Sequence, residues 1–415
     1  MAGLMAARAL SDHFEQVTLL ERDELPVNPE FRRGVPQARH THGLLAGGRQ
    51  EIERVFPGIT RELLDAGAVS GDVVRDCHWF FQSGCLAQVE SGLQAVAASR
   101  PFIEGSVRRR TAALANVTLR QGCQVEDLLF DAGRVSGVRI AGEPLIADLV
   151  VDATGRGSKS PGWLKDLGYA APVEEKVEIG LKYTTRYFRR KPSDLNGQIG
   201  AVIPPTPMGK RGGVMLAQEG DRWTVTLIAH FGPHAPEDLP GFIEWSKSIP
   251  APFIYDTIRD AEPLGDAAQA GMPASVRRRY ESLERFPEGY LVMGDAVCSF
   301  NPIYGQGMTV ATLEARELSE ALAEGDAGLA QRFFARVSKV VDNPWAIAVG
   351  NDLRMPEAVG PRNAAVNIIN WYMAKLHRAA HKDAQLSLAF HNVANLMAPP
   401  PSVMHPRLAL RVFFG

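Results

Sequence analysis

Residues 290–315 constrain the fold of this chain more than any other stretch. They begin with a short apolar run, which passes at Met293 directly into Gly294 and Asp295. Such a run predicts a buried strand, and a glycine at its end lets the backbone approach a ligand closely. In open α/β sheets, ligands bind beyond the carboxyl ends of the strands. The stretch therefore predicts an α/β fold in which Asp295 faces a ligand at the edge of the sheet.

The same stretch continues into a loop that ends in Gly305, Gln306 and Gly307, just before a predicted helix at residues 308–324. Glycines permit close contact with a bound molecule. The unpaired N–H groups and the dipole at the start of a helix favour negative charge by roughly 0.3–1 kcal/mol. The loop therefore predicts a binding site for an electron-rich group.

The N-terminal residues match the second half of a dinucleotide-binding unit. Residues 3–10 predict a short apolar helix, and residues 17–20 predict a strand that ends on Glu21. In the complete fingerprint, Gly3 would be the last of three glycines and the carboxylate of Glu21 would bind a ribose hydroxyl. Taken alone, a helix and a strand ending in an acid are weak evidence, and Glu21 could be a surface residue.

The first strand and the first two glycines of that unit do not precede residue 3 in this sequence. Without a central strand, the strand ending at Glu21 lacks its main partner and leaves backbone groups unpaired. We therefore expect Met1 to be an internal methionine of the fingerprint, with translation beginning upstream. The preceding codons should then encode a short β-branched strand followed by two glycines.

A third motif, ADLVVDATGRGS at residues 147–158, is a strand that ends in a tight turn. Together and in this order, the three motifs resemble the flavoprotein monooxygenases with the para-hydroxybenzoate hydroxylase fold, in the branch of the squalene and polyketide epoxidases. The resemblance implies FAD as the cofactor, with Asp295 holding the ribityl chain and residues 302–309 lying along the flavin ring. The usual family turn is Ala-Asp-Gly, and here Thr154 retains a hydrogen-bond donor without the charge.

The resemblance also implies contacts with the rest of FAD. Arg39 and His42 would run past the pyrophosphate and flavin, with a solvated helix start as the alternative. Arg100 and Arg108 lie about two helical turns apart, so one face could present both to the diphosphate, with surface solvation as the alternative. The complete predicted FAD-binding set is Gly3, Glu21, Arg39, His42, Arg100, Arg108, Val125, Thr154, Gly155, Gly294, Asp295, Pro302, Gly305, Gln306, Gly307, Met308 and Thr309.

The predicted architecture has three parts. An FAD-binding Rossmann-like domain of the α/β class, of the GR2 type, comprises residues 1–72, 99–172 and 280–328 and lacks its first strand. An antiparallel β-sheet substrate domain comprises residues 73–98 and 173–279, and a helical C-terminal region comprises residues 329–415. Within these parts, residues 50–66 predict one helix, and residues 134–140 and 145–151 each predict a strand.

Composition excludes several classes of function. The 415-residue chain has a net charge of −2, which does not favour nucleic acid as a partner. Its four cysteines show no metal-ligand spacing and no paired framework, so we expect a cytoplasmic setting. His40 and His42 lack a third ligand nearby, so no metal site is predicted. The apolar C-terminal helices predict core packing, with peripheral contact with a membrane or a partner as the alternative.

The activity implied by the resemblance is that of an FAD-dependent monooxygenase. It would act as an epoxidase or hydroxylase on a small apolar organic substrate, using molecular oxygen through a flavin hydroperoxide. NAD(P)H or a separate reductase would supply the electrons, and this chemistry requires no particular catalytic side chain, so none is named. The alternatives are a geranylgeranyl-reductase-like flavin enzyme that saturates double bonds and a flavin-free, decayed relative with an interaction role. A tryptophan halogenase is disfavoured because its Trp-x-Trp-x-Ile-Pro signature is absent.

Overall fold

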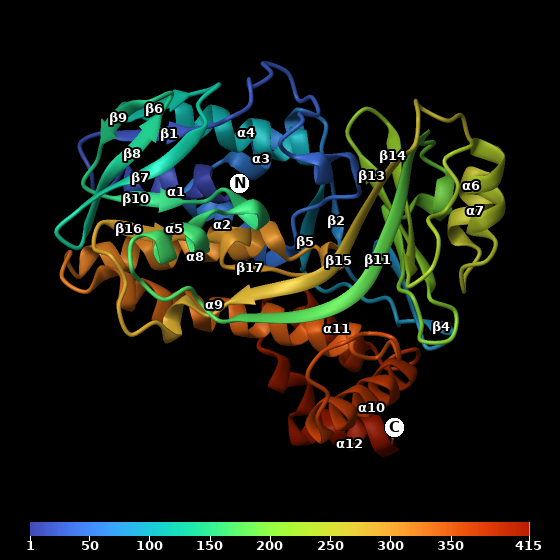
Figure 1. Ribbon diagram of the computed structural model, residues 1–415. Helices are drawn as coiled ribbons and strands as arrows, with labels where there is room; N and C mark the ends of the chain where they lie inside the picture. Colours follow the sequence, from blue (N-terminus) through green and yellow to red (C-terminus); the bar gives the residue numbers. More distant parts are fainter. Residues whose placement is uncertain (415) are drawn as a thin grey trace.

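The computed structural model describes residues 1–414. Twelve α-helices occur in this range (Figure 1): α1 (Ala2–Leu10), α2 (Ala46–Val55), α3 (Ile59–Asp65), α4 (Arg100–Ala112), α5 (Ser160–Asp166), α6 (Leu239–Ser246), α7 (Phe253–Ile258), α8 (Gly307–Ala323), α9 (Leu329–Asp352), α10 (Ala364–Ala379), α11 (Ala384–Ala394) and α12 (Pro406–Phe414).

The same residues form seventeen strands: β1 (Val17–Leu20), β2 (Val69–Asp72), β3 (Cys77–Phe81), β4 (Gly84–Cys85), β5 (Gln94–Ala97), β6 (Val117–Arg120), β7 (Val125–Asp131), β8 (Arg134–Ile140), β9 (Glu143–Ile146), β10 (Val150–Asp152), β11 (Glu174–Arg189), β12 (Gly200–Ile203), β13 (Arg211–Gln218), β14 (Arg222–His230), β15 (Ala268–Arg278), β16 (Tyr290–Val292) and β17 (Cys298–Ser299).

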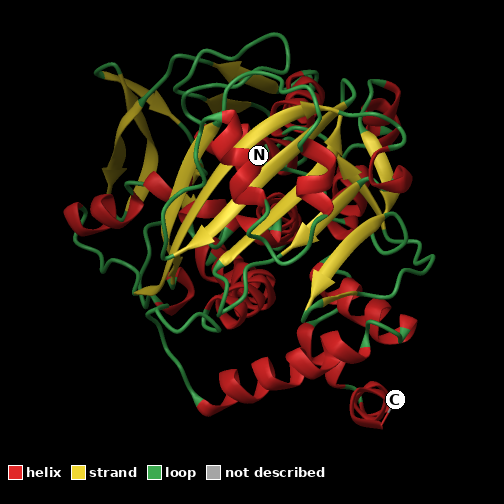
Figure 2. Ribbon diagram, turned by 90° about the vertical axis from the view of Figure 1, so that its right-hand side faces the viewer, coloured by secondary structure: helices red, strands yellow, loops and turns green. Residues whose placement is uncertain are grey.

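An eight-stranded sheet forms one side of the molecule (Figure 2), in the order β17-β15-β11-β14-β13-β12-β3-β4. Its pairs are antiparallel except for β12 and β3, which run parallel. Alternate residues of a strand point to opposite faces. One face packs Phe188 and Trp223 against Phe242 of α6, all fully buried. The opposite face supplies Tyr183, Leu216 and other residues that line an internal cavity.

A second part of the fold contains two short parallel sheets that are not joined to each other. β1 pairs with β6, and β10 pairs with β16. In the described residues, neither β1 nor β10 has a partner on its second edge, although α1 contacts both strands. Residues of both strands line the same cavity, together with Leu128, Val138 and Leu145 of the β7–β9 sheet. The fold therefore has a space beside both unpaired strand edges, which we call the β1–β10 slot.

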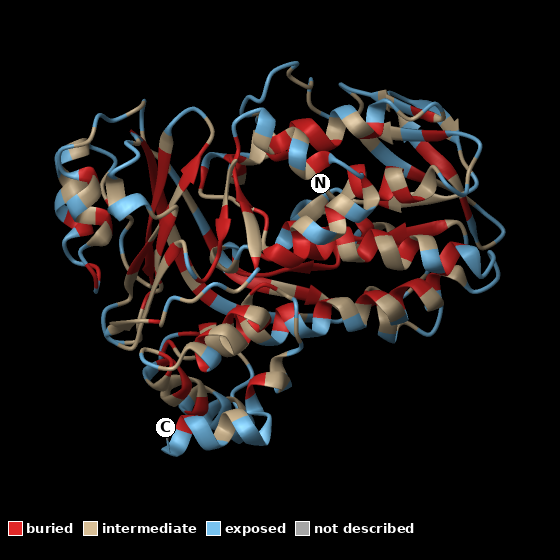
Figure 3. Ribbon diagram, turned by 180° about the vertical axis from the view of Figure 1, so that it is seen from behind, coloured by how far each residue is buried: buried red, intermediate tan, exposed pale blue. Residues whose placement is uncertain are grey.

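The C-terminal helices close one end of the molecule. Leu376 of α10 and Leu386 of α11 are fully buried, in a cluster that also includes Trp79 and Phe81 of β3. Buried residues gather on the strands of the large sheet and on the inward faces of the helices (Figure 3), and one extensive cluster runs through α1, α8, α9 and β16. Core packing thus accounts for the buried apolar positions of α10 and α11, whereas Trp371 remains 55% exposed. Among the helices in residues 1–414, none is long and apolar enough to cross a membrane.

Candidate cofactor and substrate cavity

One large cavity, of about 1660 Å³, runs through the interior. It is lined by the start of α1, the edges of β1 and β10, the 302–308 loop, the inner face of the large sheet and the C-terminal helices. Pockets that hold a single drug-sized molecule usually measure about 300–1,000 Å³. The cavity, which includes the β1–β10 slot, is therefore larger than the pocket of a single drug-sized molecule.

The strand predicted just before Gly294, which is β16, and the acidic residue Asp295 that follows it face this cavity. β16 is buried along its whole length and delivers Gly294, whose φ of +68° favours glycine. A Cβ at Gly294 would lie 2.6 Å from the Cβ of Ala2, so only glycine lets α1 begin this close to the strand. The next residue, Asp295, exposes its carboxylate to the cavity, while the surrounding protein desolvates it and raises its pKa.

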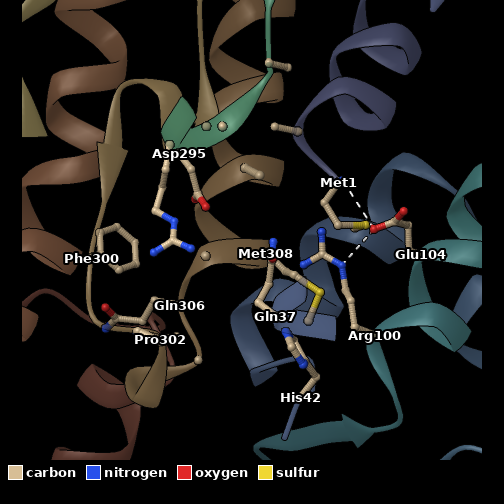
Figure 4. Close-up of a pocket in the computed structure, with 18 of the residues that line it drawn as sticks. Met1, Gln37, His42, Arg100, Glu104, Asp295, Phe300, Pro302, Gln306 and Met308 are labelled. Atoms are coloured by element: carbon tan, nitrogen blue, oxygen red, sulfur yellow. Dashed lines mark hydrogen bonds and ion pairs between the residues drawn. The ribbon is translucent and has the colours of Figure 1, made fainter. Parts of the chain in front are cut away.

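The loop after Asp295 presents the start of α8 to the same cavity. The Asn301 side chain accepts a hydrogen bond from the N–H of Ile303, and Gly305 turns the chain with a φ of +68°. α8 begins at Gly307 without a side-chain cap, so the first N–H groups of a 17-residue helix are available to a ligand. A Cβ at Gly307 would have no neighbouring atom within 4 Å outside its own helix backbone. Figure 4 shows Asp295, Pro302, Gln306 and Met308 around this space.

Replacing Asp295 with alanine is expected to weaken FAD binding about 10- to 100-fold, because a hydrogen bond to a charged group contributes about 1.5–3 kcal/mol. Flavin dissociation constants of the variant and the parent, measured by fluorescence titration, test this expectation. Asp148→Ala is the matched control, because Asp148 also borders the cavity but lies near β10 rather than beside the 302–308 loop. Equal constants for Asp295→Ala and the parent would remove Asp295 from the flavin site.

A second buried carboxylate lies behind Gly294. Glu314 of α8 is fully buried, and its Oε2 accepts a hydrogen bond from the N–H of Gly294. Its Oε1 has no partner in the described part of the chain. Burial, and to a smaller extent the charge of Asp295, raise the pKa of Glu314 to about 8. Glu314 therefore fixes the turn that carries Asp295, and near neutral pH it holds a proton.

This raised pKa predicts a pH-dependent stability. Between the ordinary value of 4.5 and about 8, folded protein holds a proton on Glu314 that unfolded chain releases, so the free energy of unfolding falls as pH rises through this window. Glu314→Gln should reduce that fall by about 1–3 kcal/mol. Denaturant unfolding at pH 5 and pH 8 measures this change in the free energy of unfolding. Glu320→Gln is the control, because Glu320 is an exposed residue of the same helix. An unchanged pH dependence in Glu314→Gln would contradict the assignment.

The other end of the cavity is built around Glu104 of α4. Its carboxylate lies 2.7 Å from Arg32, 3.0 Å from Arg100 and 3.9 Å from the amino group of Met1. Figure 4 shows Met1, Arg100 and Glu104 across the cavity from Asp295. Burial alone would raise the pKa of Glu104, but these three cations hold it well below its usual range. Arg32 also pairs with Glu21 at 2.9 Å, so it joins the strand β1 to the helix α4.

The structure places most of the predicted FAD-binding residues on one cavity. Those that line it are Gly3, Glu21, His42, Arg100, Arg108, Val125, Thr154, Gly155, Gly294, Asp295, Pro302, Gly305, Gln306, Gly307 and Met308. Arg39 and Thr309 are not among its lining residues. The guanidinium of Arg39 lies 5.1 Å from the centre of the Phe31 ring, and Thr309 packs against Gly48 of α2.

His40, which the sequence offered only as one half of a pair with His42, also lines the cavity. His40 is buried, with Nδ1 2.8 Å from the hydroxyl of Thr185 on β11, and burial lowers its pKa to about 3. Burial and the charge of Arg100 lower the pKa of His42 to about 4. Both rings are therefore neutral and unsuited to attract anions by charge. Among the described residues, no group of three or more His, Cys, Asp and Glu could hold a metal ion.

The residues of the cavity fit FAD. The uncapped start of α8 suits the electron-rich edge of a flavin ring. The carboxylate of Asp295 has no hydrogen-bond partner among the described residues and suits hydroxyl donors. Arg100 and Arg108 of α4 both line the cavity, and Arg100 lies with Glu104 beside the start of α1, where a helix N-terminus and a cation suit a diphosphate. A single site thus offers complementary groups to the ring, the sugar chain and the phosphates.

Comparison with known proteins gives the chain a family and a fold. No family model matches it. It is 38% identical to Protein Rv3254 of Mycobacterium tuberculosis over 341 residues, which are 78% of this chain and 71% of that protein. The solved structure of the flavin-dependent brominase Bmp2 covers 95% of this chain and 91% of its own at 16% identity, with a TM-score of 0.67. The p-nitrophenol 4-monooxygenase PnpA of Pseudomonas putida DLL-E4 covers 95% of both chains at 15% identity, with a TM-score of 0.64. The chain belongs to the family of Protein Rv3254, and it has the fold of the flavoprotein monooxygenases related to para-hydroxybenzoate hydroxylase.

Proposed function

We propose that this protein is an FAD-dependent monooxygenase that transfers one atom of molecular oxygen to an apolar organic substrate, by epoxidation or hydroxylation. One observation carries the proposal. The uncapped start of α8 and the carboxylate of Asp295 open into the same cavity as the apolar inner face of the large sheet. A flavin ring held at the start of α8 would face a substrate held against the inner face of the large sheet. Fold neighbours with oxygenase activity support the same conclusion.

The chain's own residues would hold the cofactor by three kinds of contact. The N–H groups at Gly307 and Met308 would bind the ring edge, Asp295 would accept hydrogen bonds from the ribityl chain, and Arg100 and Arg108 would pair with the diphosphate. Bound FAD, once reduced, supplies the electrons that activate oxygen. NAD(P)H or a reductase would in turn deliver those electrons.

The sheet would position the substrate and exclude water. Tyr183, Leu216 and Ile228 line the cavity on the inner face of the sheet. The hydroxyl of Thr226, also on this face, bonds Thr41 at 2.6 Å and Thr185 at 2.7 Å, which leaves it little capacity to bind solvent. A dry, apolar surface of this kind favours an apolar substrate and protects reactive oxygen species from water.

The proposed function is tested by isotope incorporation. Protein loaded with FAD and reduced without oxygen is mixed with ¹⁸O₂ and a panel of apolar alkenes and aromatic compounds, and the products are analysed by mass spectrometry. We expect a product that contains one labelled oxygen atom. A product that gains two hydrogen atoms and no oxygen would instead establish the double-bond reductase. Protein that never binds flavin would point to the flavin-free alternative.

A further inference from the structure

The outer surface of α10 and α12 holds a group of exposed apolar side chains. Ile368 and Trp371 of α10 are 62% and 55% exposed, and Leu410, Phe413 and Phe414 of α12 are 60%, 44% and 84% exposed. We call these five residues the C-terminal patch. Both helices lie at the end of the molecule that carries the C-terminus (Figure 1). Single exposed apolar residues are ordinary, whereas a gathered set of large ones marks an interaction surface.

The members of the patch lie next to one another. The ring centres of Trp371 and Phe413 are 5.8 Å apart, so α10 and α12 present one continuous surface. On α10, Ile368 and Trp371 share a face because they are three positions apart. Leu376 and His377 are buried and lie on the opposite side of the same helix. α10 therefore packs into the fold by one side and turns apolar side chains outward on the other.

Cations adjoin the patch. The ammonium of Lys375 lies 5.1 Å from the ring centre of Trp371 and 5.6 Å from that of Phe413. Arg378 follows Lys375 by three positions, so it continues the outward face of α10. Arg407 is exposed at the start of α12. The apolar surface is thus bordered by basic side chains on both helices.

Charge is distributed unevenly along the chain. Residues 361–414 contain six Lys and Arg and a single acid, Asp383, which gives them a net charge of +5. The whole chain carries −2, so residues 1–360 carry −7. Asp383 is paired with Arg411 at 2.7 Å, so it does not offset the cations beside the patch. A basic face of this kind repels a second copy of itself and attracts an anionic surface.

The composition of the patch fits a lipid bilayer as that anionic surface. Helices that lie in a bilayer interface expose Trp, Phe and Leu together with Lys and Arg, and Trp is enriched at the depth of the lipid headgroups. Trp371, Phe413, Phe414 and Leu410 supply the first kind of side chain, and Lys375 lies directly against two of them.

The internal cavity reaches the surface beside these helices. Ile369 of α10 and Met404, which lies two residues before α12, both line the cavity, and they are 43% and 39% exposed. An apolar substrate dissolves in the hydrocarbon of a bilayer, so docking by α10 and α12 would bring the cavity close to a store of substrate. This benefit rests on the proposed function, whereas the docking itself does not.

We propose that the C-terminal patch docks this protein onto the surface of an anionic lipid bilayer. The exposed aromatic and aliphatic side chains enter the interfacial layer, and Lys375, Arg378 and Arg407 contact lipid phosphates. α10 and α12 then lie along the bilayer surface, and the rest of the molecule stays in water.

Flotation of the purified protein with lipid vesicles tests the docking. Vesicles of equal parts phosphatidylglycerol and phosphatidylcholine are compared with vesicles of phosphatidylcholine alone. We expect the parent to bind the anionic vesicles at least about tenfold more strongly. The double variant Trp371→Ser, Phe414→Ser should lose at least about tenfold of this binding. Val27→Ser, Met208→Ser is the matched control, because both residues are highly exposed apolar residues outside the C-terminal helices.

A charge-reversal variant tests the cations. Lys375→Glu, Arg407→Glu should bind the two kinds of vesicle equally, because the patch then lacks its attraction to anionic lipid. Arg61→Glu, Lys247→Glu is the control and should keep the preference, because both residues are exposed cations far from α10 and α12 in the sequence. Circular dichroism checks that every variant folds as the parent does.

Fluorescence quenching locates the contact. Lipids brominated in their acyl chains quench a tryptophan that lies among them, so the parent should be quenched by anionic vesicles that contain such lipids. Trp371→Phe should float with the vesicles as the parent does but escape the quenching, because it keeps an aromatic ring at the patch and removes the indole.

Three results would overturn the inference: a parent that does not float with anionic vesicles, serine variants that float as well as the parent, or quenching that persists in Trp371→Phe. A parent that is dimeric in sedimentation velocity, with a monomeric Trp371→Ser, Phe414→Ser variant, would assign the patch to a second copy and also overturn it. None of these measurements involves flavin or turnover. Lipid binding by a protein that incorporates no labelled oxygen would therefore retain the docking and reject the oxygenase, and label incorporation without lipid binding would do the reverse.

Discussion

A valine at position 307 is expected to abolish FAD binding and leave the fold intact. Gly307 is the first residue of α8 and faces the cavity, and a side chain built there meets no protein atom within 4 Å. Its backbone is helical rather than left-handed, so valine introduces no strain of the kind expected at Gly305, where φ is +68°. The branched side chain would instead fill the space next to the N–H groups that we assign to the flavin ring.

Flavin titration and thermal unfolding measure the two halves of this prediction. We expect FAD affinity to fall at least about 100-fold, which corresponds to about 2.8 kcal/mol, with a change in melting temperature of only about 1–2 °C. Gly162→Val is the matched control, because Gly162 lies near the start of α5 with equally open space and does not line the cavity. Normal FAD affinity in Gly307→Val would show that the ring lies elsewhere.

A strand grafted in front of Met1 is expected to raise both stability and FAD affinity. The β1–β10 slot presents two unpaired parallel strand edges and apolar residues such as Val17, Leu19 and Val151. A β-branched segment joined to α1 by Gly-x-Gly would pair with both edges and cover this surface. It would also replace the buried amino group of Met1, whose pKa burial lowers to about 6, with a neutral peptide group. The new turn would bring further N–H groups to the diphosphate.

The matched control for the graft is a Gly/Ser extension of the same length, which cannot form the strand pairing. Melting temperature and FAD dissociation constant are compared for the two extended proteins and the parent. We expect the β-branched extension to raise the melting temperature by several degrees, about 5 °C, and to tighten FAD binding at least about tenfold. An effect equal to that of the Gly/Ser extension would show that the slot does not accept a strand.

Elements with a clear local pattern could be predicted from the sequence. The predicted strands at residues 17–20 and 134–140 are confirmed as β1 and β8, and the predicted helix at residues 308–324 is α8, one residue earlier. The single helix predicted for residues 50–66 is wrong. Pro57 and Gly58 divide it into α2 and α3, because Gly58 adopts a φ of +85° and starts the second helix. The strand predicted at residues 145–151 is likewise two strands, β9 and β10.

The residues of the site could be predicted from the sequence only where they belong to one contiguous motif. Gly294, Asp295 and the 302–308 loop are contiguous, so their common cavity follows from a strand, a turn and a helix start. Arg32 could not be found in this way, because it bridges Glu21 and Glu104 from segments far apart in the sequence. The packing of His377 between Phe81 and Phe390 depends on how α10, α11 and β3 come together, which no local pattern encodes.

The central claim is that the cavity binds FAD with its ring at the start of α8. The most direct measurement is an equilibrium titration of FAD into the purified protein, followed by flavin absorbance and fluorescence, with the Gly307→Val variant in parallel. The account predicts one FAD per chain, a perturbed flavin spectrum, and loss of both in the variant. It is contradicted if neither the 415-residue chain nor its strand-extended form binds FAD, or if Gly307→Val binds it as the parent does.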